Sequence, residues 1–349
     1  MIDVRLVTAD CASDCCRGFL AISAHGWVGR GTRSAKDHGT AADIAQGSSR
    51  NSDKCRCGLG THHGSNVLAG HGHSLRQLVL PVYWAVMDDV SDMMRENSSM
   101  TDRGYAVVTG ASSGIGAASA RALAKEGFKV IAAARRVDML ANLAKESELI
   151  TAWELDVTDQ ASVDALATHL ADKTLNVLVA NAGGAFDGTT VADADVESWI
   201  KAYDVNVIGA LRSIKSLIPA LIKSGEGTIV LMGSTAGRIV YENGGSYTAA
   251  KHAVAALAET LRLELAGEPV RVVELAPGMV KTDEFAVKRF GGDKDRAAKI
   301  YEGVAEPLTA DDVAEAVRWS VMLPHHFNID LMVIRPLAQA AQHKVVRRV

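Results

Sequence analysis

The chain has 349 residues, enough for one large α/β domain or two ordinary ones. Its 37 basic and 41 acidic residues give a formal net charge of -4, without a sustained basic stretch that would attract a phosphate backbone. We therefore expect no nucleic-acid partner. The longest apolar run near the N-terminus, 78–87, is about half a membrane span and contains Pro81, and the first 20 residues lack a signal-peptide pattern. We expect neither a membrane anchor nor a leader.

The sequence changes character near residue 100. All five cysteines and six of the eleven histidines precede residue 74, and this part shows neither a helical nor a strand period. From about Thr101, short apolar runs of strand type alternate with helical stretches rich in alanine and leucine. This alternation is typical of a parallel sheet covered on both faces. Residues 100–349 are therefore predicted to form an α/β domain with a single doubly wound parallel sheet.

Residues 1–99 are expected to be an extension of low order that is not part of the working protein. Met100 is followed at once by the first predicted strand, and the remaining 250 residues match the size of one doubly wound domain. A metal site or another small module in this stretch is the alternative. Its cysteines and histidines lack the paired C-x2-C and H-x3-H spacings of zinc sites, so no metal is predicted. The absence of cysteine from residues 100–349 fits a cytoplasmic protein.

A glycine-rich turn follows the first predicted strand. Residues 105–108 read YAVV, residues 109–116 read TGASSGIG, and a helical stretch comes next. This strand, turn and helix context makes the glycine pattern specific. Gly110 permits the tight turn, Gly114 lets the backbone approach a pyrophosphate, and Gly116 allows close packing of the helix, whose N-terminus holds the anion. The turn predicts a dinucleotide site that also includes Ser112, Ser113 and Ile115.

Two arginines follow the second predicted strand, residues 129–134. In a dinucleotide fold this strand ends near the adenosine ribose, where an acidic residue would bind the 2′-hydroxyl of NAD. Arg135 and Arg136 stand there instead. A guanidinium cannot accept a hydroxyl proton but can bind a 2′-phosphate, so the pair favours NADP(H). The alternative is that one of the two arginines only caps the strand exit.

Tyr247 and Lys251 are four residues apart on a predicted helix and share a face. A phenol titrates near 10 in water, and a neighbouring ammonium favours the phenolate, so we expect a lowered pKa for Tyr247 and a role in proton transfer. A buried strand, 227–232, ends just before Ser234. Its hydroxyl should lie at the carboxyl edge of the sheet, where it can hydrogen-bond a substrate carbonyl.

These motifs resemble the short-chain dehydrogenase/reductase family, in register from Thr101 to about Ala341. The family's TGxxxGxG motif matches 110–116, and its YxxxK motif matches Tyr247 and Lys251. Further matching positions are the adenine-contacting Asp156 with Val157, the NAG motif of Asn181, Ala182 and Gly183, the active-site Asn206 and Ser234, and the nicotinamide-facing Pro277, Gly278, Val280 and Thr282. The motifs specify the fold and the reaction type and say little about the substrate.

The resemblance implies a Rossmann fold and hydride transfer between NADP(H) and a hydroxyl or carbonyl group. It implies that Tyr247 donates the proton, that Ser234 polarises the carbonyl oxygen, and that Lys251 binds the nicotinamide ribose and tunes Tyr247. Asn206 would hold a water that continues the proton relay. The family also implies a homodimer or homotetramer packed through residues 196–223 and 247–266.

Within the family, the C-terminal half resembles NADP-dependent 3-hydroxy acid and serine dehydrogenases. Residues 283–307, which we call the lid segment, are expected to cover the substrate and carry several basic side chains. Arg289 is expected to pair with a substrate carboxylate, the alternative being a solvated basic helix face. The expected substrate is a small polar 3-hydroxy acid, a serine-like compound or a semialdehyde. The alternatives are a reductase of bulkier ketones or aldehydes, and a non-catalytic NADP(H)-sensing regulator.

Overall fold

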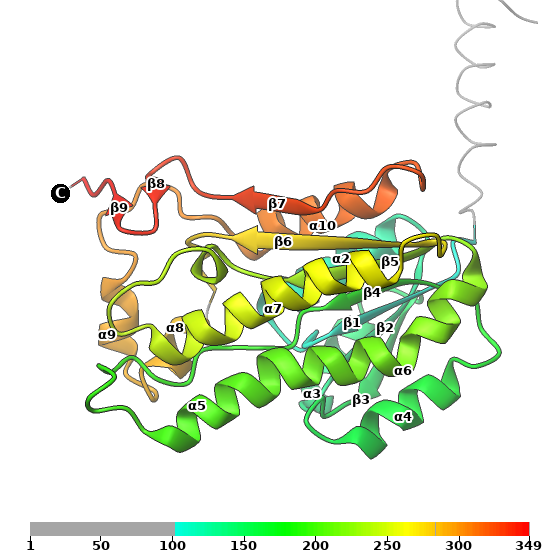
Figure 1. Cartoon of the computed structure of the whole chain (residues 1–349), viewed down its shortest axis with the longest axis horizontal. Coiled ribbons are helices and arrows are strands. Elements are labelled where there is room, and N and C mark those ends of the chain that lie inside the picture. The colour runs from blue at the N-terminus through cyan, green and yellow to red at the C-terminus, as the bar shows by residue number, and fades with distance from the viewer. Residues whose placement is uncertain (1–101, 283, 349) are drawn as a thin grey trace, which may run out of the picture. The chain divides into compact units, whose positions relative to one another are not determined.

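The computed structural model describes residues 102–282 and 284–348, so the predictions for residues 1–99 lie outside the described residues. Within this part, seven strands form one parallel sheet in the order β3-β2-β1-β4-β5-β6-β7 (Figure 1). The strands are β1 (Tyr105–Thr109), β2 (Lys129–Ala134), β3 (Ile150–Glu154), β4 (Leu175–Ala180), β5 (Gly227–Met232), β6 (Val270–Pro277) and β7 (Leu331–Ile334). The predicted doubly wound parallel sheet is confirmed.

The central strands carry apolar side chains on both faces because both faces of the sheet are covered. In β6, Val270 and Val272 belong to one apolar core, whereas Val273 and Leu275 belong to the other. All eight residues of this strand are buried. Apolar residues at successive positions, interrupted in β6 by Arg271 and Glu274, thus mark a strand between two layers of helices.

Helices cover both faces of the sheet. One core lies under α2 (Gly114–Lys125), α3 (Val137–Ala144) and α10 (Ala310–Met322). The second core lies under α4 (Gln160–His169), α6 (Gly209–Ser224) and α7 (Gly245–Glu264). In Figure 1, α6 and α7 cross in front of the sheet.

One long apolar helical run crosses the second face. The run Val196–Ser224 has the length and mean hydropathy of a membrane span. It consists of α5 (Val196–Tyr203), a π-helical turn η1 (Asp204–Ile208) and α6. Ile214, Leu217 and Leu221 of α6 are fully buried in the core against the sheet, which accounts for the hydropathy of this part of the run.

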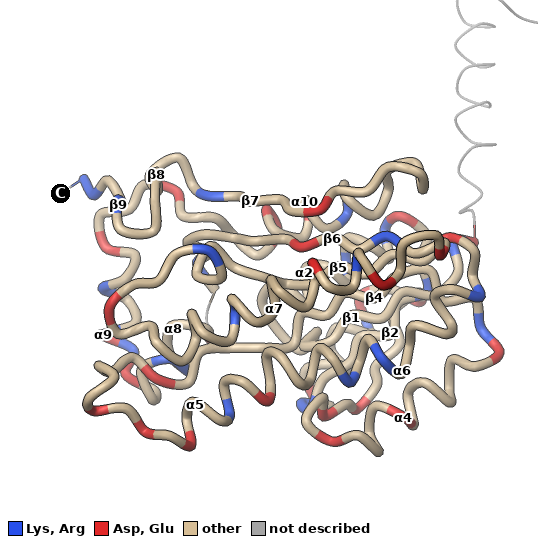
Figure 2. Tube along the Cα trace, in the orientation of Figure 1, with Lys and Arg blue, Asp and Glu red and all other residues tan. Residues whose placement is uncertain are grey.

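The strand order reverses between β1 and β4, and the carboxyl ends of the strands on either side form the crevice where ligands bind in such sheets. The described lid segment holds α8 (Phe285–Arg289) and α9 (Lys294–Lys299), beyond the arrowheads of β6 and β7 in Figure 1. A short 3-10 turn, η2 (Thr235–Gly237), follows β5. Figure 2 shows positive and negative residues interspersed along the described chain.

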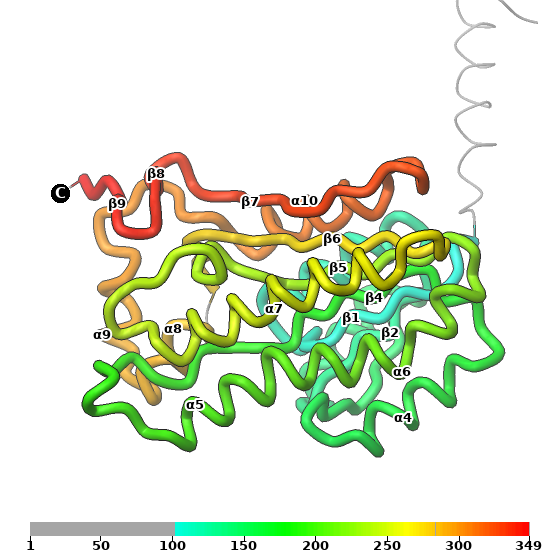
Figure 3. The backbone as a smooth tube through the Cα atoms, viewed as in Figure 1, coloured from blue at the N-terminus to red at the C-terminus, as the bar shows by residue number. Residues whose placement is uncertain are grey.

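The chain ends in a hairpin beside the lid segment. Strands β8 (Gln339–Ala341) and β9 (Lys344–Val345) pair antiparallel, and Arg347 forms a bridge with Val304 after α9. Figure 3 shows this red hairpin next to the orange tube of the lid segment. The side-chain oxygen of Gln339 accepts a 2.8 Å hydrogen bond from the Met279 backbone amide. The C-terminal residues thus fix the chain just after β6.

Candidate active site

The glycine-rich turn between β1 and α2 leaves no space for side chains at two of its glycines. Gly110 and Gly114 adopt φ of 68° and 54°, a region that favours glycine. A Cβ on Gly116 would lie 2.4 Å from the Gly110 carbonyl oxygen, and one on Gly110 would lie 2.9 Å from Ala182 Cα. The turn therefore packs tightly against the chain that follows β4 and presents bare backbone at the start of α2, which fits a pyrophosphate group.

The predicted NAG motif holds this turn in place. The Asn181 side-chain amide donates to the Thr109 carbonyl at 2.9 Å, and the Thr109 hydroxyl accepts from the Asn181 and Ala182 backbone amides at 3.0 Å each. These bonds join the ends of β1 and β4 at the point where the strand order reverses. The motif thus supports the shape of the cofactor crevice.

Arg136 reaches back over the glycine-rich turn. Its Nη2 donates to the Ser112 and Ser113 hydroxyls at 2.8 Å each. Arg135 is exposed, and its charge acts on Asp156. The adjacent arginines therefore face different surroundings, and Arg136 is the one beside the predicted phosphate site.

Asp156 and Val157 follow β3, which pairs with β2 on the same side of the crevice as Arg136. Burial acts to raise the pKa of Asp156. The Thr158 amide and hydroxyl donate to its carboxylate at 3.0 and 2.8 Å. These hydrogen bonds, together with the charges of Arg135 and Arg212, outweigh burial and lower the pKa. Asp156 is thus an ionised hydrogen-bond acceptor at this edge. Val157 packs against Gly209, where a Cβ would lie 2.6 Å from its methyl group.

Ser234 lies at the carboxyl end of β5, as predicted. Its hydroxyl accepts from the Ala236 amide at 3.1 Å, capping η2, and lies 3.4 Å from the Pro277 carbonyl of β6. Ser234 and Tyr247 are both buried, and the Ser234 hydroxyl acts to lower the pKa of the phenol. The two hydroxyls therefore stand together, as a carbonyl-binding pair requires.

The expected lowering of the Tyr247 pKa is wrong for this structure. Burial raises the pKa of the phenol above its usual value, and the opposing effect of the Ser234 hydroxyl is smaller. Tyr247 packs among Ala185, Ala236 and the lid residue Phe285, whose ring meets it edge-on at 5.4 Å between centroids. The sequence shows the nearby lysine but not this apolar enclosure. A phenol with a raised pKa keeps its proton at neutral pH, the state that carbonyl reduction needs.

Lys251 is buried one helical turn from Tyr247. Its ammonium donates to the Met232 carbonyl at 2.8 Å and lies 5.7 Å from the centroid of the Tyr247 ring. Burial lowers the pKa of Lys251 to about 8, and the charge of Glu274 in β6 acts in the opposite direction. The lysine is thus fixed close to the phenol but titrates nearer to neutrality than a lysine in water.

Asn206 lies in the π-helical turn η1, and its side chain lies against the chain at Gly183 and Gly184. Its side-chain amide donates to the Gly184 and Ala202 carbonyls at 2.9 and 2.7 Å. A Cβ on Gly183 would lie 2.4 Å from the Asn206 Oδ1 and 3.6 Å from the Lys251 Nζ. The absence of a side chain at Gly183 therefore leaves room for the Asn206 side chain, and the Lys251 ammonium lies close to the same point.

The residues after β6 reach the glycine-rich turn. The Thr282 methyl group would be 3.5 Å from a Cβ on Gly114, and Pro277 lies beside the Ser234 hydroxyl. Gly278 packs against Gln339, and Val280 pairs with Leu308. This segment thus runs from the Ser234 hydroxyl to the predicted pyrophosphate site.

Arg289 of α8 lies near the two tyrosines Tyr241 and Tyr247. Its Nη2 donates to the Asn243 carbonyl at 2.8 Å, and its guanidinium lies 5.2 Å from the centroid of the Tyr241 ring. The Asn243 backbone adopts φ of 58° in the turn before α7. The Arg289 Nε is buried without a hydrogen-bond partner among the described residues, and the Arg289 charge acts on the Tyr247 phenol.

Two acidic residues were missed by sequence reasoning. Glu284 pairs with Arg136, and buried Glu274 pairs with Arg238 after η2. Glu284 and Arg136 are 148 residues apart, so no local spacing could reveal their pairing. Glu274 interrupts an apolar strand, and this was the available signal.

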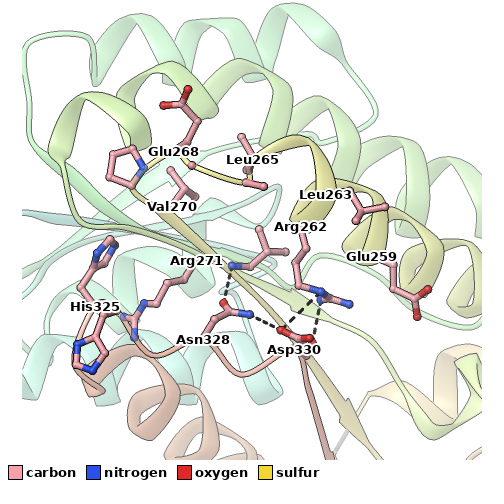
Figure 4. A pocket seen from close by; sticks show the side chains of 15 residues that line it. Glu259, Arg262, Leu263, Leu265, Glu268, Val270, Arg271, His325, Asn328 and Asp330 are labelled. Carbon is pink, nitrogen blue, oxygen red and sulfur yellow. Dashed lines mark hydrogen bonds and ion pairs between the residues drawn. The ribbon is translucent and has the colours of Figure 1, made fainter.

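A further hollow has none of the predicted catalytic side chains in its lining. A cavity of about 830 Å³ lies between the end of α7 and the start of β6 (Figure 4). It is lined by residues such as Arg262, Arg271, His325 and Asp330. Within residues 102–282 and 284–348, no three His, Cys, Asp or Glu side chains cluster in a way that could hold a metal ion. The predicted cysteine and histidine alternative lies outside these residues.

Comparisons with known proteins identify the family. The model of the short chain dehydrogenase family matches residues 104–289. An uncharacterized oxidoreductase of Mycobacterium tuberculosis is 52% identical over 241 residues, 69% of this chain and 94% of that protein. The NADP-dependent 3-hydroxy acid dehydrogenase of Escherichia coli K12 is 35% identical over 237 residues, 67% of this chain and 95% of that protein. The solved closed form of a serine dehydrogenase complexed with NADP+ has a TM-score of 0.65 and 34% identity, covering 70% of this chain and 100% of that structure. The chain therefore belongs to the short-chain dehydrogenase/reductase family.

Proposed function

We propose that this protein is an NADP(H)-dependent oxidoreductase that interconverts a hydroxyl and a carbonyl group on a small 3-hydroxy acid or serine-like substrate. The observation that carries the proposal is the convergence of Ser234, Tyr247, Lys251 and Asn206 beside a glycine-rich turn suited to a pyrophosphate. The serine dehydrogenase complexed with NADP+ and the NADP-dependent 3-hydroxy acid dehydrogenase support the choice of cofactor and substrate class.

The residues divide the chemistry among them. NADP(H), when bound, supplies or accepts the hydride, and the protein supplies position and protons. The Ser234 hydroxyl holds the substrate oxygen beside the Tyr247 phenol, which gives its proton to that oxygen during reduction. The Lys251 ammonium stabilises the phenolate as it forms. Asn206 and Lys251, brought together over Gly183, define the route by which a proton returns to Tyr247.

The direct test follows NADPH oxidation and NADP+ reduction by the full chain with short 3-hydroxy acids, serine, semialdehydes and larger ketones. Turnover of the carboxylated compounds supports the proposal. Turnover of only the larger ketones would move the assignment to a bulky-carbonyl reductase. Tight NADPH binding without turnover of any compound would favour a sensor, which needs the glycine-rich turn but not the proton relay.

Arg289 is proposed to bind the substrate carboxylate. It approaches the Tyr241 ring and the Asn243 carbonyl, and its buried Nε has no hydrogen-bond partner among the described residues. Replacing Arg289 with glutamine is expected to lower kcat/KM for the hydroxy acid about 10- to 100-fold, because a charge-assisted contact contributes about 1.5–3 kcal/mol. Steady-state kinetics with the acid and its methyl ester measure this effect.

Two controls distinguish a specific contact between Arg289 and the substrate carboxylate from a general effect of removing a positive charge from the lid segment. The methyl ester has no charge to pair, so its kcat/KM should change little in Arg289→Gln. Lys294→Gln removes a positive charge from exposed α9 and should leave both compounds unaffected. A change below about twofold for the acid in Arg289→Gln would rule out the carboxylate contact.

Carbonyl reduction is expected to slow as the pH rises through about 8, the pKa to which burial lowers Lys251. Below this value the ammonium is charged and stabilises the phenolate that Tyr247 becomes on giving up its proton; above it the charge is lost. The dependence of kcat/KM on pH reports this group in the free enzyme. Lys251→Arg keeps its charge throughout and should lack the decline. A flat profile to pH 9 in the unsubstituted protein would contradict this assignment.

We further propose a homodimer or homotetramer formed through α5 and its neighbours, in the cytoplasm. On α5, the apolar side chains of Val196, Ile200 and Tyr203 are 67%, 55% and 46% exposed. A hollow of about 500 Å³ lies beside them, bounded by α5 and the start of α7. Exposed apolar side chains of this kind favour burial against a second copy, and the matching helices are those expected from the family.

A further inference from the structure

Arg136 makes two sets of contacts with opposite consequences for a phosphate. Its Nε and Nη2 donate to the hydroxyls of the glycine-rich turn, at 3.2 Å and 2.8 Å to Ser112 and at 2.8 Å to Ser113. Its Nη1 donates to the carboxylate of Glu284, which belongs to the lid segment. The hydroxyls direct the guanidinium toward the cofactor crevice, whereas Glu284 supplies an anion of the protein's own.

Glu284 is an anion throughout the working pH range. Burial acts to raise its pKa, but hydrogen bonds from Arg136 and Lys288 outweigh burial and lower the pKa to about 2. The side chains of Arg136 and Glu284 are 39% and 30% exposed, so solvent and a ligand can reach the pair. A guanidinium whose Nη1 edge holds one carboxylate cannot offer the same edge to a phosphate.

Glu284 also forms an ion pair with a second cation, Lys288. The Lys288 ammonium, one turn along α8, donates to the other carboxylate oxygen, Oε2, at 2.5 Å. The carboxylate therefore keeps a positive partner if Arg136 turns to a different anion, and the exchange leaves no charge unpaired. This arrangement makes the ion pair with Arg136 replaceable.

We propose that Glu284 competes with the 2′-phosphate of NADP(H) for Arg136, so that a lid carboxylate sets the affinity and selectivity of the cofactor site. This inference rests on the proposed use of NADP(H). The ion pair must open before Arg136 can bind the phosphate with its Nη1 edge, and it can re-form when the nucleotide leaves. Glu284 thereby favours release of the cofactor at the expense of its affinity.

The test measures dissociation constants of NADPH and NADH by nucleotide fluorescence on the full chain. Glu284→Gln is expected to tighten NADPH binding about two- to fivefold, the range for a partly exposed ion pair, and to leave NADH binding unchanged. Asp295→Asn, a matched loss of one negative charge on exposed α9, should alter neither value. In the Arg136→Gln background, Glu284→Gln should have no further effect, since the competed group is gone.

Equal tightening of NADPH and NADH, or persistence of the effect without Arg136, would show general charge repulsion and overturn the proposal. Weaker or unchanged NADPH binding in Glu284→Gln would also overturn it, because Glu284 would then position Arg136 or have no effect on it. The proposed function is judged separately, by whether the unsubstituted protein prefers NADPH to NADH and turns over a substrate.

Discussion

Replacing Tyr247 with phenylalanine is expected to lower kcat about 10²- to 10⁴-fold, the usual contribution of a positioned general acid. The substitution removes only the hydroxyl from a side chain that packs among Ala185, Ala236 and Phe285, so the fold should persist. Ser234 would still hold the substrate oxygen, but no phenol would be present to donate the proton. Stopped-flow or steady-state NADPH oxidation with the substrate identified in the panel measures the loss.

NADPH binding should remain within about threefold in Tyr247→Phe, which separates a chemical defect from a misfolded site. Tyr241→Phe provides the matched control, since it removes a hydroxyl from the same aromatic cluster and keeps the Tyr247 phenol together with Ser234 and Lys251. Its effect on kcat should be far smaller. Retention of more than a tenth of the activity in Tyr247→Phe would show that another group donates the proton.

Replacing Arg136 with glutamine is expected to weaken NADPH binding about 10- to 100-fold, because charge-assisted hydrogen bonds to a phosphate contribute about 1.5–3 kcal/mol. Arg136 already lies against the Ser112 and Ser113 hydroxyls of the glycine-rich turn. The affinity for NADH, which lacks the 2′-phosphate, should change little, so the preference between the two nucleotides should shrink. Fluorescence titration of each nucleotide gives both values.

Arg135→Gln is the control for this change. Arg135 is exposed and acts electrostatically on Asp156, so its loss should weaken NADPH binding by less than about threefold. Equal losses in the two variants would mean that the arginines share the phosphate. Equal weakening of NADH in Arg136→Gln would mean that Arg136 shapes the glycine-rich turn and does not recognise the 2′-phosphate.

The features that sequence reasoning predicted well depend on short chain distances. The strand, glycine turn and helix at 105–125 follow one another directly, and a tyrosine and lysine four residues apart on a helix must share a face. The carboxyl ends of parallel strands lie at one edge, so Ser234 could be placed beside that edge from the end of its strand. Each of these inferences needs only local periodicity and the rules of parallel sheets.

The features that sequence reasoning missed depend on enclosure and on distant partners. The direction of the Tyr247 pKa shift follows from how completely Phe285 and neighbouring alanines exclude water, which spacing does not report. The contact of Arg289 with the Asn243 carbonyl joins residues 46 apart, through a turn with a left-handed backbone. Such contacts are decided by how the lid segment packs, after the sheet has been built.

Because Asn206 lies in the π-helical turn η1 between α5 and α6, the number of residues in this helical run matters for the active site. A regular helix turns by about 100° per residue, so deleting one residue near Asn206 would rotate α5 against α6 by that amount. A surface loop would absorb such a change, but here it would swing either the Asn206 amide away from Gly184 or the apolar face of α6 away from the sheet. Relatives and designed variants that keep the chemistry should therefore accept substitutions along this run far more readily than insertions or deletions.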